Sequence, residues 1–217
     1  MSFDRDMRHW LLGAMLIAAA TSNALAAPAP LPAHYAAMFD KGKTWVYDWS
    51  LVTFGAEDEK TGKPTHLTER GKVTCKVAEV TRRGGATVAH ITCDQDLGRK
   101  FVVAGDWAAT DKGLWRIGEA SDADAIRDAL KEPPTIEGQP KVGEKITHVD
   151  LFDKKHDTIV TGIRESAKIK GWCAYEDSSN ADPDGGRVVT CFAPGIGIQS
   201  GYDDVGGTLN KLEYTAR

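Results

Sequence analysis

The four cysteines of this chain are spaced in a way that indicates their chemistry. Cys75 and Cys93 are 18 positions apart, and so are Cys173 and Cys191. There is no C-x-x-C motif, which argues against a thioredoxin-like redox site. Four cysteines allow three connectivities. Since each 18-residue segment is typical of a β-hairpin, we predict structural disulfides Cys75–Cys93 and Cys173–Cys191.

The sequence offers few other groups for catalysis. It has no G-x-S-x-G nucleophile motif, no phosphate-binding loop and no H-E-x-x-H zinc motif. His148 and Asp150 would share one face of a strand, and Asp157 follows His156. A hydrolase assembled from distant residues is therefore the least favoured function, and we predict no catalytic residues and no cofactor.

One loop has part of a calcium-binding pattern. Oxygen-bearing side chains alternate from Asn180 to Asp184 and precede Gly185, as in the first half of an EF-hand loop. The twelfth position, where a bidentate glutamate is needed, is Cys191. Asn, Asp and Gly also favour ordinary turns. We predict no metal site, and calcium binding by this loop stays open.

Aromatic side chains are the stronger functional indication. Trp45, Tyr47 and Trp49 alternate along one strand and would share a face, and Trp107 and Trp115 lie on later strands. Such side chains line apolar pockets but also fill sheet cores. We treat these five as the candidate site for an apolar small molecule or lipid, with core filling as the alternative.

The N-terminus has the pattern of an export signal. A short apolar run from Trp10 to Ala20 precedes an A-x-A cleavage pattern ending at Ala26. We expect a signal peptide at 1–26, a leader segment at 27–39 whose Ala/Pro-rich beginning (27–33) is extended, and a periplasmic or extracellular location. The mature chain has no second long apolar segment, so we expect no transmembrane segment. A net charge of −4 argues against nucleic acid as a partner.

Positions 40–217 are expected to form one β-rich domain, with halves at 40–118 and 140–217. A single helix is predicted at 121–131, capped by Ser121 or Asp122 and ended by Pro133. Period-two alternation and turn residues predict the strands. The expected strands are 44–54, 66–80, 86–93, 100–107, 113–117, 145–152, 158–169, 172–176, 187–192, 198–202 and 209–215. The first cysteine pair is repeated 98 positions later as the second pair, which raises the possibility of an internal duplication.

Register arithmetic places the cysteines on particular faces. Direct opposition of Cys75 and Cys93 centres their hairpin on Gly84, which predicts a three-residue loop Arg83–Gly85 and an inward-facing disulfide. The second pair centres on Asp182. There, Val189 and Tyr175 would join the cysteines on one face, with Trp172, Val188 and Phe192 on the other, so both faces could be buried.

Short segments resemble those of exported bacterial β-rich proteins of unknown function. The segment Phe192-Ala-Pro-Gly-Ile-Gly197 is similar to a turn between late strands of their curved sheets. Gly42–Tyr47 and Gly113–Trp115 are similar to segments of the same group. The resemblance implies no catalytic residues. The architecture also resembles the half-barrel of periplasmic lipoprotein carriers.

These inferences predict a mainly β fold: an antiparallel curved sheet or barrel of about ten to twelve strands, with the helix at 121–131 between two β-rich halves. The favoured function is a non-enzymatic exported protein that binds an apolar ligand. A structural or protein-interaction module of the cell envelope is the alternative.

Overall fold

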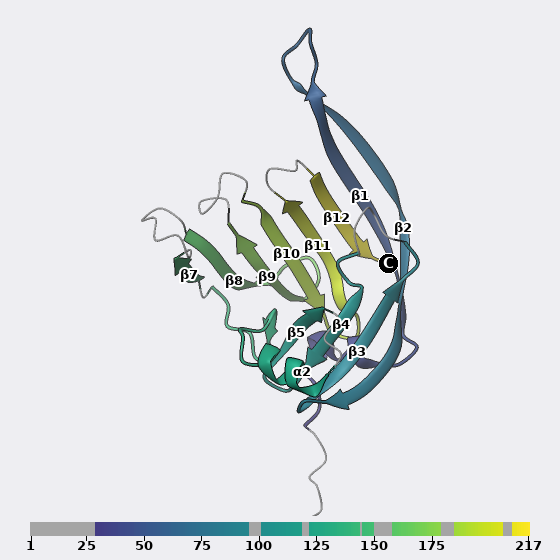
Figure 1. Ribbon diagram of the computed structural model, residues 1–217, viewed down its shortest axis with the longest axis vertical. Helices are drawn as coiled ribbons and strands as arrows, with labels where there is room; N and C mark the ends of the chain where they lie inside the picture. The colour runs from purple at the N-terminus through teal and green to yellow at the C-terminus, as the bar shows by residue number, and fades with distance from the viewer. Residues whose placement is uncertain are drawn as a thin grey trace, which may run out of the picture.

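A computed structural model describes residues 29–95, 101–118, 122–143, 145–149, 158–178, 185–205 and 210–217. Its strands form one antiparallel sheet with the order β6-β5-β4-β3-β2-β1-β12-β11-β10-β9-β8-β7. The sheet curls into an incompletely closed barrel (Figure 1). The predicted mainly β fold of ten to twelve strands is therefore confirmed.

The sheet consists of two meanders joined side by side. The first contains β1 (Thr44–Glu57), β2 (Pro64–Arg83), β3 (Ala86–Cys93), β4 (Gly105–Ala109), β5 (Gly113–Gly118) and β6 (Ile136–Glu137). The second contains β7 (Lys145–Val149), β8 (Thr158–Ser166), β9 (Gly171–Asp177), β10 (Arg187–Ala193), β11 (Gly197–Val205) and β12 (Asn210–Ala216). The first and last strands pair from Tyr47↔Ala216 to Thr53↔Asn210, which makes the whole sheet continuous.

The expected leader contributes to the fold. Residues Ala33–Ala36 form helix α1 and Ala37–Phe39 form the 3-10 turn η1. Tyr35 and Met38 are fully buried, and the Tyr35 hydroxyl donates to the Thr110 carbonyl at 2.7 Å. Two large apolar side chains at helical spacing thus pack this later part of the leader segment into the end of the barrel.

Helix α2 (Ala123–Ala129) confirms the predicted helix, two residues shorter at each end. The Asp122 carboxylate caps it by accepting a hydrogen bond from the Ala125 N–H at 2.7 Å. Ile126 is fully buried in a small cluster with Val88 and Ala108. The helix therefore covers the convex face of the first meander, where Figure 1 shows it beside β5.

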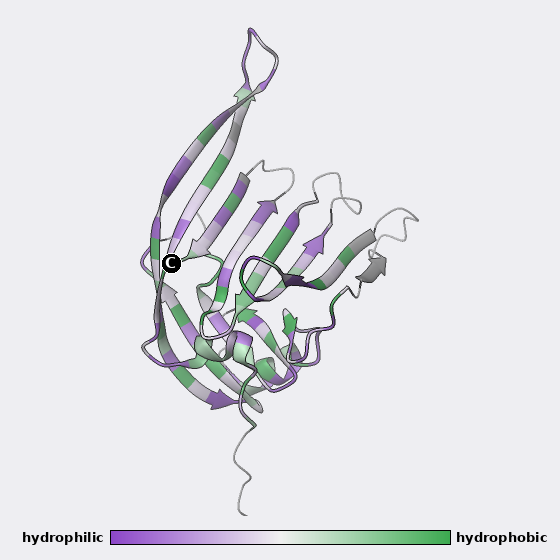
Figure 2. Ribbon diagram, turned by 180° about the vertical axis from the view of Figure 1, so that it is seen from behind, coloured by the Kyte–Doolittle hydropathy of each residue, from purple (hydrophilic) through white to green (hydrophobic). Residues whose placement is uncertain are grey.

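Alternating side chains divide each strand between a concave and a convex face, and Figure 2 shows the resulting bands of hydropathy. Tyr47 and Val73 are buried opposite one another on the concave face, whereas Asp48 opposes Lys72 on the convex face. The concave core gathers the aromatic rings. The Tyr214 ring, for example, stands edge-on to Phe101 with 5.3 Å between centroids.

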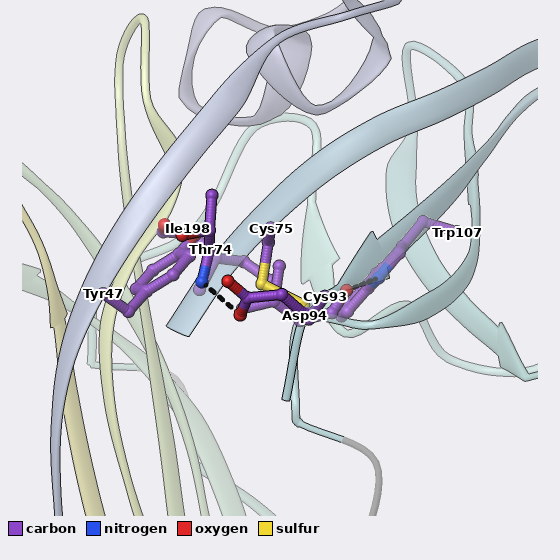
Figure 3. The surroundings of a disulfide bond; sticks show 8 residues. Tyr47, Thr74, Cys75, Cys93, Asp94, Trp107 and Ile198 are labelled. Atoms are coloured by element: carbon purple, nitrogen blue, oxygen red, sulfur yellow. Dashed lines mark hydrogen bonds between the residues drawn. A yellow bond between two sulfur atoms is a disulfide. The ribbon is translucent and has the colours of Figure 1, made fainter. Parts of the chain in front are cut away.

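Both predicted disulfides are present. Cys75–Cys93 joins β2 to β3, and Cys173–Cys191 joins β9 to β10, with each pair directly opposed. The first disulfide faces the core, as predicted; Figure 3 shows it between Tyr47 and Trp107, with the Asp94 carboxylate accepting from the Thr74 N–H at 2.8 Å.

The loop of the first hairpin differs from the prediction. Arg83 pairs with Ala86 across a two-residue turn, in which Gly84 and Gly85 have φ of 57° and 89°. A β-bulge between Val77 and Glu79 adds one residue to β2. That extra residue restores the direct opposition of the cysteines that an even-length turn alone would have removed. The prediction of the face was correct and that of the three-residue loop was wrong.

One predicted strand begins later than expected. Of the predicted strand at 100–107, Phe101–Ala104 forms a turn, closed by the Ala104 N–H donating to the Phe101 carbonyl at 2.8 Å. Phe101 and Val103 are buried in the core nonetheless. These residues are apolar because the turn packs into the core. The alternation of apolar residues in the sequence looks the same for such a turn as for a strand.

The two halves share a strand order but not a disulfide position. Each is a meander of consecutive neighbours. The first disulfide joins the second and third strands of its half, while the other joins the third and fourth. The matched cysteine spacing therefore does not mark equivalent places in the two halves.

Candidate ligand-binding pocket

The five predicted aromatic residues lie mainly in the core. Trp45, Tyr47, Trp107 and Trp115 are at most 8% exposed, and Trp49 is partly buried. Four polar groups are satisfied by backbone carbonyls. Trp45 donates to Ile196, Tyr47 to Ile198, Trp107 to Val103 and Trp115 to Glu132, at 2.7–2.9 Å. These bonds fix the rings in place as structural side chains. Their predicted contact with a ligand stays untested.

A pocket of about 600 Å³ lies elsewhere, on the concave face of the second meander. Its volume falls within the range typical of small-molecule sites. None of the five aromatic residues lines it. Its floor is formed by side chains from three neighbouring strands: Thr161 and Ile163 of β8, Ala174 and Glu176 of β9, and Val188 and Thr190 of β10.

The floor follows from strand register. Ile163 opposes Ala174, and Ala174 opposes Thr190, which places these three side chains in one row across the sheet. The next row contains Thr161, Glu176 and Val188. The small Ala174 methyl group at the centre leaves space above the sheet. Large side chains fill the corresponding space in the first meander.

The other wall is the segment between α2 and β7. Its pocket-lining residues are Pro133, Pro134, Thr135, Glu137 and Lys141. Backbone hydrogen bonds hold both ends of this segment. The Thr135 N–H donates to the Leu114 carbonyl at 2.8 Å, and the Gly143 N–H donates to the Ile163 carbonyl at 2.9 Å. The segment therefore runs from β5 to β8 and bridges the two edges of the open barrel.

Helix α1 supports this wall from below. The His34 Nε2 lies 3.1 Å from the Glu137 carbonyl, and burial lowers the pKa of His34 from its ordinary value of 6.5. The neutral imidazole can donate to that carbonyl. The N-terminal segment thus links the base of the barrel to the pocket wall.

The polar groups of the pocket are few. Thr161 and Thr190 contribute hydroxyls to an otherwise mainly apolar floor, and Glu176 and Lys141 supply charges of opposite sign. Thr190 is buried, with 7% of its surface exposed, whereas Glu176 and Lys141 are exposed. The arrangement suits a ligand with a large apolar part and one polar group.

Sequence reasoning missed this pocket, although the register of the second hairpin contained a signal for it. That register was predicted correctly and places Val188 and Phe192 on the face opposite Cys191. Thr190, between them, had to share that concave face. Only the tertiary structure shows that this face is not fully packed, because the pocket lies between it and segment 133–141.

Other residues considered in the sequence fall in undescribed parts of the chain. Asp150, His156, Asp157 and the loop Asn180–Asp184, with its partial calcium-binding pattern, lie outside the described residues, as does the predicted signal peptide. The backbone of His148 is described in β7, but its side chain is not.

Within the described ranges, no group of three His, Cys, Asp or Glu side chains is arranged to hold a metal ion. None of the helices described is both long and apolar enough to cross a membrane. A comparison of the chain with protein-family models and with curated proteins found no match.

Proposed function

We propose that this chain is an exported binding protein that holds a mainly apolar ligand in the pocket between β8–β10 and segment 133–141. The observation that carries the proposal is the pocket itself: about 600 Å³ of space beside Ile163, Ala174 and Val188 in a domain whose other half is tightly packed. Native cores leave few voids larger than a water molecule. A pocket of this size therefore supports a binding function.

The two disulfides support an oxidising compartment for the folded protein, because such bonds persist mainly in secreted and periplasmic proteins. Together with the predicted signal peptide at 1–26, they favour a periplasmic or extracellular location. In that setting the mainly apolar pocket would shelter the apolar part of a poorly soluble molecule from water.

The binding test uses N-phenylnaphthylamine, an uncharged fluorophore that brightens in apolar surroundings. We expect saturable binding to the wild-type protein and a loss of at least tenfold in affinity for Ala174→Trp, whose indole would occupy the pocket. Thr215→Trp is the matched control, because Thr215 is exposed on the convex face of β12. Absence of binding by the wild type, or equal effects of both substitutions, would contradict the proposal.

An interaction module of the cell envelope is the second candidate, and the long β1–β2 hairpin favours it. β3 pairs only with positions 75–83 of β2, and among the described strands none pairs with the other edge of positions 64–73. Figure 1 shows this hairpin projecting beyond its neighbours. Free strand edges can pair with another chain. Light scattering that detects a concentration-dependent oligomer, lost in Lys72→Pro, would favour this candidate.

A further inference from the structure

An unusual polar group, the hydroxyl of Tyr214, lies behind the pocket-lining residue Thr190. This side chain is only 3% exposed, and its oxygen makes no hydrogen bond of good geometry to any described residue. Buried hydroxyls nearly always have a partner, because leaving one unpaired costs free energy. Unpaired groups that persist in a native protein often mark a functional site.

The position of this hydroxyl follows from the row of residues that forms the pocket floor. Tyr214 of β12 opposes Gly201 of β11, and Gly201 opposes Thr190 of β10. The Tyr214 ring lies across Gly201, since a Cβ atom at that glycine would be 2.1 Å from the tyrosine oxygen. The hydroxyl therefore points along the row toward Thr190, which lines the pocket.

The chemistry of the two hydroxyls is complementary. Burial raises the pKa of Tyr214, so the phenol stays protonated and can donate; the nearby Thr190 hydroxyl acts on this pKa in the opposite direction. A threonine oxygen can accept one hydrogen bond while its own proton is donated elsewhere. Thr190 can thus accept from Tyr214 and donate into the pocket.

We infer that Thr190, oriented by Tyr214, is the polar anchor of the pocket, and that it selects ligands with an uncharged hydrogen-bond acceptor, such as a hydroxyl or carbonyl, on an apolar body. The inference rests on the proposed function. Thr190 would touch the ligand, and Tyr214 would be a positioning residue behind it.

Hydrogen-bond chemistry and the cost of burial argue for an uncharged group. An ammonium group has no lone pair and could not accept from Thr190. A carboxylate could accept, but Asp203 lies in the adjacent row on β11 and raises the pKa of Tyr214 by its negative charge. Glu176 is in that same adjacent row on β9. Burying a charged group beside Thr190 would also cost more than burying a neutral one.

The experiment displaces N-phenylnaphthylamine with three compounds that share one alkyl chain: 1-dodecanol, dodecanoate and dodecylammonium. We expect wild-type protein to bind dodecanol at least tenfold more tightly than either ion. In Thr190→Val and Tyr214→Phe, dodecanol affinity should fall about fivefold, as expected for one lost hydrogen bond. The controls are Thr215→Val and Tyr202→Phe, whose side chains lie on the convex face.

A stability measurement separates this role from a structural one. The Tyr214 hydroxyl makes no hydrogen bond of good geometry in the free protein and would donate to Thr190 only once a bound ligand accepts the Thr190 proton. Tyr214→Phe should therefore melt at the same temperature as the wild type or higher, while binding dodecanol less well. If both variants bind dodecanol as the wild type does, or if an ion binds more tightly, the anchor inference is wrong although the pocket still binds ligands. If the fluorophore itself fails to bind wild-type protein, the proposed function is wrong.

Discussion

The two disulfide hairpins have the same cysteine spacing and opposite orientations in the sheet. Cys75 is fully buried in the concave core, in register with Trp45. Cys173 and Cys191 are also buried but lie on the convex face, in line with Ser200, outside that core cluster. In the first hairpin the cross-link is part of the core. In the second hairpin the cross-link lies on the other face, and Ala174 and Thr190 occupy the concave face. The two disulfides close loops of equal length, but one lies in a tightly packed region and the other beside a pocket.

Neighbouring side chains explain the difference. On the concave face of the first meander, Val77, Ala89 and Trp107 are buried in one cluster. On the same face of β10, burial decreases from Phe192 at 0% exposed to Val188 at 39%. The second meander is thus packed at its base and open toward the other end, where the pocket lies.

Removal of the disulfides is expected to have the largest effect on the free energy of unfolding. Removing either disulfide as a double alanine variant should lower the free energy of unfolding by about 3 kcal/mol, because the two closed loops have equal length. Cys75→Ala/Cys93→Ala should lose a further 1 to 2 kcal/mol, roughly, from the space left in the core. Urea denaturation of both variants measures the difference. Equal losses would show that a position in the concave core cluster adds nothing.

A smaller effect tests packing on the concave face. Ala89→Leu should destabilise by about 1–3 kcal/mol, because Ala89 is fully buried opposite Trp107 and has no room for a larger side chain. Ala174→Leu, its counterpart beside the pocket, should change stability by less than about 0.5 kcal/mol. Thermal melts of the two variants check this. Similar destabilisation by both substitutions would mean that the pocket floor around Ala174 is as tightly packed as the core.

The smallest effect concerns the link between helix α1 and the pocket wall. Burial lowers the pKa of His34 in the folded state. As the pH falls below the ordinary value of 6.5, the unfolded chain binds a proton more readily than the folded one, so stability should decrease. His34→Gln should reduce this slope. Urea midpoints at about pH 8 and about pH 5.5 test the effect; an unchanged slope in the variant would show that His34 is not responsible.

Local patterns in the sequence determined much of the fold. Alternation placed Trp45, Tyr47 and Trp49 on one face, and a capping aspartate with a proline stop located α2. These features depend on residues near one another in the chain, where periodicity and capping act directly. The cysteine spacing fixed both disulfide partners and their faces for a similar reason, since each pair lies within one hairpin.

Tertiary structure decided the rest. The burial of Tyr35 beneath the barrel and the passage of segment 133–141 across the open edge depend on contacts between distant parts of the chain. The pocket depends on them most, because an empty space is defined by what surrounds it. The sequence by itself determined which face Thr190 occupies; only the assembled sheet decided that this face borders a pocket, with the Tyr214 hydroxyl behind it.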